Sequence, residues 1–159
     1  MFLTVHAAAG FLIGKYIHSN LWAFVIGFVS HLLMDMPVHD SLEIKKAKAN
    51  KTKKENNIIM LRIVFFIELP LIILTAVFVK LFGTTQISGS YLAGFLGAVI
   101  MDFLWGFSDV LPQVKIFKIF KKINNWTHTR FTKDTHIVWQ KWLPRQLIVW
   151  LILLLFLII

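Results

Sequence analysis

Histidine and carboxylate side chains that fall within or beside apolar stretches are the residues of this chain most able to do chemistry. An ionisable side chain at the centre of a membrane helix costs at least ~2.5 kcal/mol, so each one is a functional candidate. The candidates are His6, His31, Asp35, His39, Asp40, Glu68, Asp102 and Asp109, with His128 and His136 in a later polar segment. Histidine and carboxylate without cysteine form a ligand set that suits Zn²⁺, Mn²⁺ or Fe²⁺.

The spacing places several candidates on shared helix faces. His31 and Asp35 are four residues apart, so a helix carries both side chains on one side. Asp102 and Asp109 are seven apart and share a face in the same way. Each also has a structural explanation: a hydrogen bond within the helix for His31 and Asp35, one between helices for Asp102, and a solvated helix end for Asp109.

Two further histidines depend on the course of their helices. His6 shares a stripe with Gly10 and Gly14, and glycines at that spacing let a neighbouring helix approach closely. His39 continues the His31 face only if the helix runs through Pro37, and proline disfavours helix in the residue before it.

The other polar residues leave alternatives open. Glu68 lies near the middle of an apolar stretch just before Pro70, so it either reaches the cluster or binds where the proline frees a backbone carbonyl. His128 and His136 are eight residues apart and share a face if their segment is helical, but a surface role in this basic segment has equal weight. His18 lies in a short turn away from the rest, and we exclude it.

The elements that must position these residues are membrane helices. Hydrophobic residues make up 57% of the 159 residues and charged ones 16%, whereas soluble domains are nearer half and a quarter. The apolar residues form long runs, which predicts an integral membrane protein and excludes a soluble enzyme, a disordered tail and a disulfide scaffold. The absence of cysteine excludes a thiolate nucleophile. We expect an all-α polytopic bundle in a single membrane domain, with five helices at about 2–17, 21–38, 58–82, 91–110 and 143–159.

The charge distribution predicts an orientation. Lysine and arginine gather in two segments, 41–57 and 112–145, whereas the turns near Asn20 and at 83–90 contain none. The positive-inside rule places both basic segments and the N-terminus in the cytoplasm and the C-terminus outside, in a multi-pass protein of the inner membrane without a removable signal peptide. Anionic lipid, rather than nucleic acid, then explains the net charge of +9. Within this charge pattern, Val114–Ile123 reads as a basic amphipathic helix in the interface plane.

Two short motifs resemble a known family. Thr4–Gly10 reads TVHAAAG, and Phe28–Asp40 reads FVSHLLMDMPVHD, which gives a histidine before a small-residue turn and then Ser-His-x-x-x-Asp closing in Pro-x-His. This pattern resembles small bacterial integral-membrane proteins described as metal-dependent hydrolases, some of them likened to zinc-dependent phospholipase C. Ser108–Pro112 and the pair His128 and His136 are similar to the second half of that family.

The resemblance implies a metal site. Its implied members are His6, His31, Asp35, Asp109 and His128, with Asp102 beside them. We expect a divalent metal, zinc first, with His6, His31, Asp35, Asp109 and His39 as ligands and with Asp102 or His128 handling the proton. Two departures from the family leave the roles of His39 and His136 open. Many members have Pro-His where this chain has Pro37-Val38-His39, and the family's later histidines are closer together.

These features predict a membrane-embedded, metal-dependent hydrolase acting on a phosphoester or lipid-like substrate at the cytoplasmic leaflet. Its surroundings are membrane lipids, and nucleic acid is not an expected partner. One alternative is a membrane protein that handles metal ions or protons without hydrolysis, although only Glu68 extends the cluster towards the other face. The other is a non-catalytic membrane scaffold. The sequence leaves the substrate, the number of metal ions and the oligomeric state open.

Overall fold

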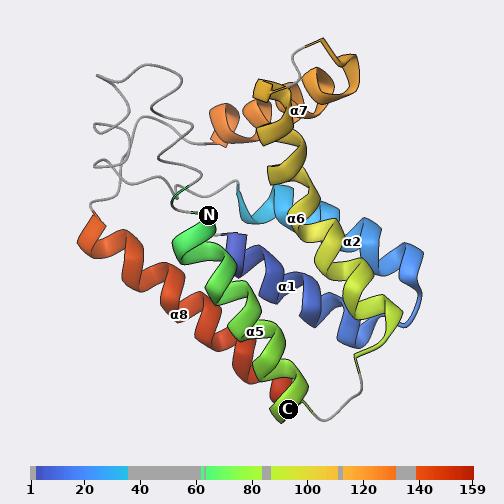
Figure 1. The fold of residues 1–159 in the computed structure, drawn as a ribbon, viewed down its shortest axis with the longest axis vertical. Helices are drawn as coiled ribbons and strands as arrows, with labels where there is room; N and C mark the ends of the chain where they lie inside the picture. Colours follow the sequence, from blue (N-terminus) through green and yellow to red (C-terminus); the bar gives the residue numbers. More distant parts are fainter. Residues whose placement is uncertain (1–2, 36–61, 63, 84–86, 111–112, 132–138) are drawn as a thin grey trace.

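The chain is helical wherever its structure is described. The computed structural model describes residues 3–35, 62, 64–83, 87–110, 113–131 and 139–159, and these ranges contain six α-helices, one π-helical turn and no strand. The elements are α1 (Leu3–Tyr16), α2 (Asn20–Met34), η1 (Val64–Glu68), α5 (Leu69–Phe82), α6 (Gly89–Val110), α7 (Lys115–Phe131) and α8 (Trp139–Ile158) (Figure 1). The expected all-α fold class is therefore confirmed.

Five of these helices alternate in direction along the bundle. The start of α1 and the end of α2 lie at the same end of the bundle, together with the start of α5 and the end of α6 (Figure 1). Helix α7 also lies at this end, beyond α6. Because of this alternation, the polar residues near the starts of α1 and α5 and near the ends of α2 and α6 lie at the same end of the bundle.

Glycines set the distance between α6 and its two main neighbours, α1 and α2. A Cβ atom built on Gly10 would lie 2.5 Å from the carbonyl oxygen of Gly94, which is too close for any real side chain. A Cβ on Gly27 would meet the same Gly94 carbonyl, and one on Gly97 would meet the carbonyl of Phe24. The three backbones approach this closely only because no side chain stands between them.

A π-helical turn precedes α5 at a proline. Val64–Glu68 forms this turn, and Pro70 occupies the first turn of α5. Proline has no N–H to donate and crowds the preceding carbonyl, so a local widening of the helix accommodates it. Within the turn, Phe66 is 79% exposed, whereas Glu68 is only 4% exposed and faces the bundle.

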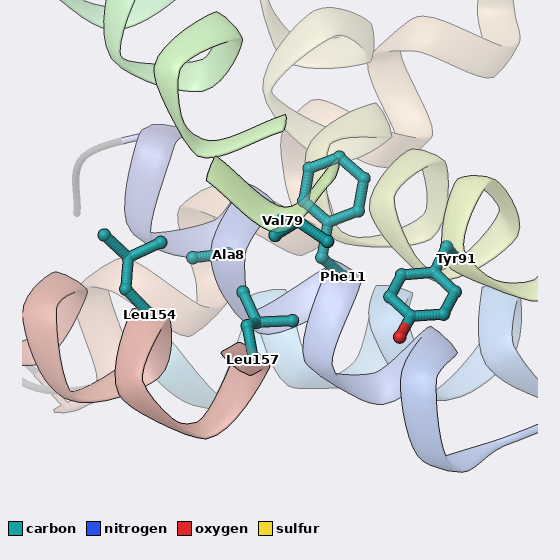
Figure 2. Close-up of a cluster of buried hydrophobic side chains, with 6 residues drawn as sticks. All are labelled: Ala8, Phe11, Val79, Tyr91, Leu154 and Leu157. Carbon is teal, nitrogen blue, oxygen red and sulfur yellow. The ribbon is translucent and has the colours of Figure 1, made fainter. Parts of the chain in front are cut away.

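The apolar core surrounds α1. Ten of the 14 residues of α1 are buried, which makes it the central helix of the bundle. Its residues Ala8 and Phe11 pack in one cluster with side chains from three other helices (Figure 2). These are Val79 on α5, Tyr91 on α6, and Leu154 and Leu157 on α8.

Large apolar side chains also cover the outside of the bundle. Trp22 on α2, Leu81 on α5 and Leu155 on α8 are each more than half exposed. Such extensive apolar surface requires lipid or a partner to cover it. Among the described residues, one stretch, Val64–Phe82, is long and apolar enough to cross a membrane, and the other apolar helices are shorter by the same measure. One such helix does not establish several crossings, so the five-helix topology and its orientation stay predictions.

The glycine contacts can be tested with a matched pair of substitutions on α6. We expect Gly97→Ala to lower the free energy of unfolding by about 1–3 kcal/mol, because the new methyl group meets the backbone of Phe24. Gly89→Ala is the control, because its methyl group meets only the side chain of Asn20, at 3.1 Å. Thermal unfolding of the detergent-purified variants measures the difference, and equal melting temperatures would contradict the expected clash.

Candidate metal centre

Four polar side chains from three parts of the chain meet at the end of the bundle. His6 comes from α1, His31 from α2, Asp35 from the residue that caps α2, and Asp102 from α6. Asp35 lies between the two imidazoles, with Oδ1 3.1 Å from Nε2 of His6 and Oδ2 3.3 Å from Nε2 of His31. Nε2 of His31 also lies 3.8 Å from Oδ1 of Asp102.

Local helix geometry places each of these groups. The amide of Asp35 donates to the carbonyl of His31 at 3.0 Å, so the helical turn that joins them is complete and both side chains leave α2 on one side. His6 lies one turn before Gly10 on α1, and Asp102 lies one turn after Ala98 on α6. Each ligand candidate is therefore close to a point where the helices touch.

The hydrogen bonding of His31 determines which of its nitrogens is free. Nδ1 lies 2.7 Å from the carbonyl oxygen of Ala98 and must donate to it, because a carbonyl only accepts. In the neutral ring, Nε2 then carries no proton and has a free lone pair. This nitrogen faces Asp35 and Asp102. It is buried and has no hydrogen-bond partner among the described residues. A lone pair facing two carboxylates requires a cation or a proton between them.

His6 is enclosed in the same way. Its side chain is fully buried, and its Nδ1 has no hydrogen-bond partner in the described part of the chain. The centroids of the His6 and His31 rings are 4.2 Å apart, and the ring planes make an angle of 30°. Two positively charged rings at this distance would repel strongly in buried surroundings, so at least one ring is neutral and can act as a ligand.

The group could hold a metal ion. His6, His31 and Asp102 each offer one ligand atom, and these atoms all lie within 4.8 Å of one another. At a tetrahedral zinc site the bonds of 2.0–2.2 Å separate neighbouring donor atoms by roughly 3.3–3.6 Å. Within this set, Nε2 of His31 and Oδ1 of Asp102 are 3.8 Å apart, which is closer to this spacing than to the roughly 2.7–2.9 Å of a charge-assisted hydrogen bond.

The cluster is open on one side. His6, His31 and Asp35 are at most 2% exposed, whereas the side chain of Asp102 is 36% exposed. Of the four side chains, Asp102 is therefore the one that a small molecule or a lipid headgroup can reach directly.

Glu68 has a role that the sequence did not indicate. Its Oε2 accepts hydrogen bonds from the backbone amide of Thr4 at 3.0 Å and from the Thr4 hydroxyl at 2.6 Å. Thr4 lies in the first turn of α1, where backbone amides have no partner within the helix and a negative charge is favourable. Glu68 thus caps α1 from another helix, through Thr4, which lies two residues before His6.

Lys15 is a second buried polar residue that sequence reasoning missed. Its ammonium group donates to the carbonyl oxygens of Phe156 at 3.1 Å and Leu157 at 3.3 Å. These are carbonyls of the last turn of α8, where a positive charge is favourable. The partners are 141 residues apart along the chain, so no local pattern could have indicated the contact.

Five other candidate residues lie outside the described side chains, and one of them is Asp40. Asp109 lies in α6 and His128 in α7, but only the backbone of each is described. His39 and His136 lie outside the described residues. Their expected roles stay predictions.

Comparison of the chain with protein-family models, with curated proteins and with solved structures finds no match. The family suggested by the two sequence motifs therefore stays a prediction. The described residues define an all-helical protein with a buried cluster of histidine and aspartate that could hold a metal ion.

The cap of α1 by Glu68 can be tested through Thr4. We expect Thr4→Ala to lower the free energy of unfolding by about 1–3 kcal/mol, because a buried carboxylate loses its shortest hydrogen bond. Thr4→Ser retains the hydroxyl and serves as the control. Denaturation in detergent measures both, and a Thr4→Ala protein as stable as Thr4→Ser would show that the bond contributes nothing.

Proposed function

We propose that the chain is a polytopic membrane protein with the histidine–aspartate cluster at its cytoplasmic end. Helices α1, α2, α6 and α8, together with the continuous helix formed by η1 and α5, would be the membrane helices. The alternating directions and the exposed apolar surface support this arrangement. With 22 and 20 residues, α6 and α8 measure about 33 and 30 Å, close to the thickness of a bilayer core. The shorter α1 is enclosed by other helices rather than by lipid.

The cluster at this end would bind a divalent metal ion, and we assign zinc as the first candidate. His6, His31 and Asp102 would be its ligands, a set of imidazole and carboxylate that zinc prefers when cysteine is absent. The observation that carries this proposal is the buried Nε2 of His31, which faces two carboxylates without a hydrogen-bond partner. Two ionised carboxylates and two neutral imidazoles have a charge of −2, and a divalent cation balances it.

The reaction that this site supports best is hydrolysis of a phosphoester or lipid-like substrate. A divalent ion supplies a Lewis acid for the phosphoryl or carbonyl oxygen and a water that ionises near neutral pH. Asp35 is the carboxylate of the cluster that is not assigned to the ion, and it would accept and return the proton. Its Oδ1 would also accept a hydrogen bond from Nε2 of His6 and hold that ring, whereas the ring of His31 is held through Nδ1 by the carbonyl of Ala98. This proposal exchanges the roles that the sequence predicted, in which Asp35 was a ligand and Asp102 handled the proton.

The exposed edge of Asp102 would be the approach for the substrate. In the proposed orientation this edge lies near the headgroups of the cytoplasmic leaflet. The exposed lysines of α7 lie at the same end of the bundle and would favour an anionic substrate.

The metal site is tested by elemental analysis of the purified protein. We expect about one equivalent of a divalent transition metal in the unsubstituted protein and a loss to background in His6→Ala and His31→Ala. His18→Ala is the control, because His18 is exposed and lies in the turn between α1 and α2, at the other end of α1 from His6. If the unsubstituted protein holds only background metal, even after zinc is added, the proposed metal site is refuted. A proton between His31 and the carboxylates would then explain the cluster. That result would favour the proton-handling alternative.

Hydrolysis needs a separate test with the metal-loaded protein in detergent or lipid discs. We expect turnover of a chromogenic phosphodiester or of a labelled phospholipid, lost on chelation and restored by zinc. Asp35→Asn is expected to retain the metal but to lower the rate by 10²-fold or more, because it cannot accept the proton. A protein that binds the metal and hydrolyses neither substrate would count against the enzyme and leave the metal site intact.

A further inference from the structure

Helix α7 presents a face of lysine and isoleucine away from the bundle. Lys115, Lys118 and Lys122 are exposed and are spaced three and four residues apart, which aligns them in one stripe. Ile119 and Ile116 lie beside this stripe, and they are 57% and 54% exposed. These five residues form the outer face of α7. No aspartate or glutamate occurs anywhere in the helix.

The opposite side of α7 is attached to the bundle. The ring of Phe120 packs edge-on against the ring of Phe28 on α2, with 6.3 Å between their centroids. Helix α7 also contacts α6, which precedes it in the chain. The outer face is therefore directed away from the bundle by a packed aromatic contact.

We propose that the outer face of α7 binds an anionic lipid bilayer, at the leaflet that surrounds this end of the bundle. Three lysines complement the negative headgroups, and the adjoining isoleucines enter the boundary between headgroups and acyl chains. Exposed isoleucines argue for lipid rather than nucleic acid, since an aliphatic side chain offers no ring on which a base can stack. Trp126, which is 51% exposed on the same helix, is also a residue type that gathers at membrane interfaces. The inference rests on the proposed location of the bundle in a membrane.

The contact has a consequence for the metal centre. Phe28, on which α7 packs, precedes His31 by about one turn of α2. Helix α6 also leads from Asp102 to α7. A leaflet bound by α7 is thus held beside the exposed edge of Asp102, which makes the phosphate of an anionic phospholipid the substrate class that the site would meet.

A label at position 119 tests the inference, because the chain contains no cysteine and Ile119→Cys gives a single attachment point. The full-length protein, labelled there with an environment-sensitive fluorophore, is placed in lipid discs of either zwitterionic or mixed anionic composition. We expect a blue shift of the label in the anionic discs only. The shift should be lost in the triple variant Lys115→Gln, Lys118→Gln, Lys122→Gln and retained in the control Lys80→Gln, which changes an exposed lysine at the opposite end. If the triple variant does not fold, high salt added to the labelled protein replaces it and should abolish the shift.

Three results would overturn the inference. The first is the same emission in both kinds of disc. The second is a shift that depends on the number of protein copies per disc, which would identify a second copy as the occupant. The third is an equal shift produced by an RNA oligonucleotide in detergent without anionic lipid. Metal content measured on the same samples separates the two proposals. If no sample contains metal, the proposed metal centre is refuted, whereas the shift of the label still decides the proposed lipid contact of α7.

Discussion

The close approach of α6 to α1 and α2 is the constraint on which the rest of the structure depends. Gly94 faces Gly10 on α1 and Gly27 on α2, so one level of α6 touches both helices. His6 lies about one turn from Gly10, and His31 lies one turn from Gly27. A wider separation at the glycines would therefore move the two imidazoles away from each other and from the carboxylate of α6. The small residues of the crossing and the polar residues of the cluster form one arrangement.

The sequence predicted those features that follow from spacing along one helix. The four-residue interval between His31 and Asp35 predicted a shared face, and their contact is present in the structure. Gly10 and Gly14 predicted a close helix neighbour, and α6 is that neighbour. The runs of apolar residues predicted an all-helical chain, and the length of a run can be read without knowledge of the other helices.

Contacts between distant segments could not be predicted in this way. The bond between Thr4 and Glu68 joins residues 64 positions apart, and its presence depends on which helix lies next to the start of α1. The π-helical turn before Pro70 also affects where Glu68 points, and a hydropathy pattern carries no signal for such a turn. Likewise, the sequence could list the histidines and carboxylates at one level but could not determine which of them meet. To identify Asp102 as the α6 carboxylate that lies near His31, one must know how α2 and α6 are placed relative to each other.

The enclosure of α1 has a consequence for the order of assembly. This helix carries Thr4, His6 and Lys15, which are all buried, and each has its polar partner on another helix. The carbonyls that bind Lys15 belong to residues synthesised 141 and 142 positions later. Until α8 has been made, the ammonium group lacks these acceptors and α1 lacks part of its apolar cover. The central helix therefore reaches its final environment only after α8 has been made.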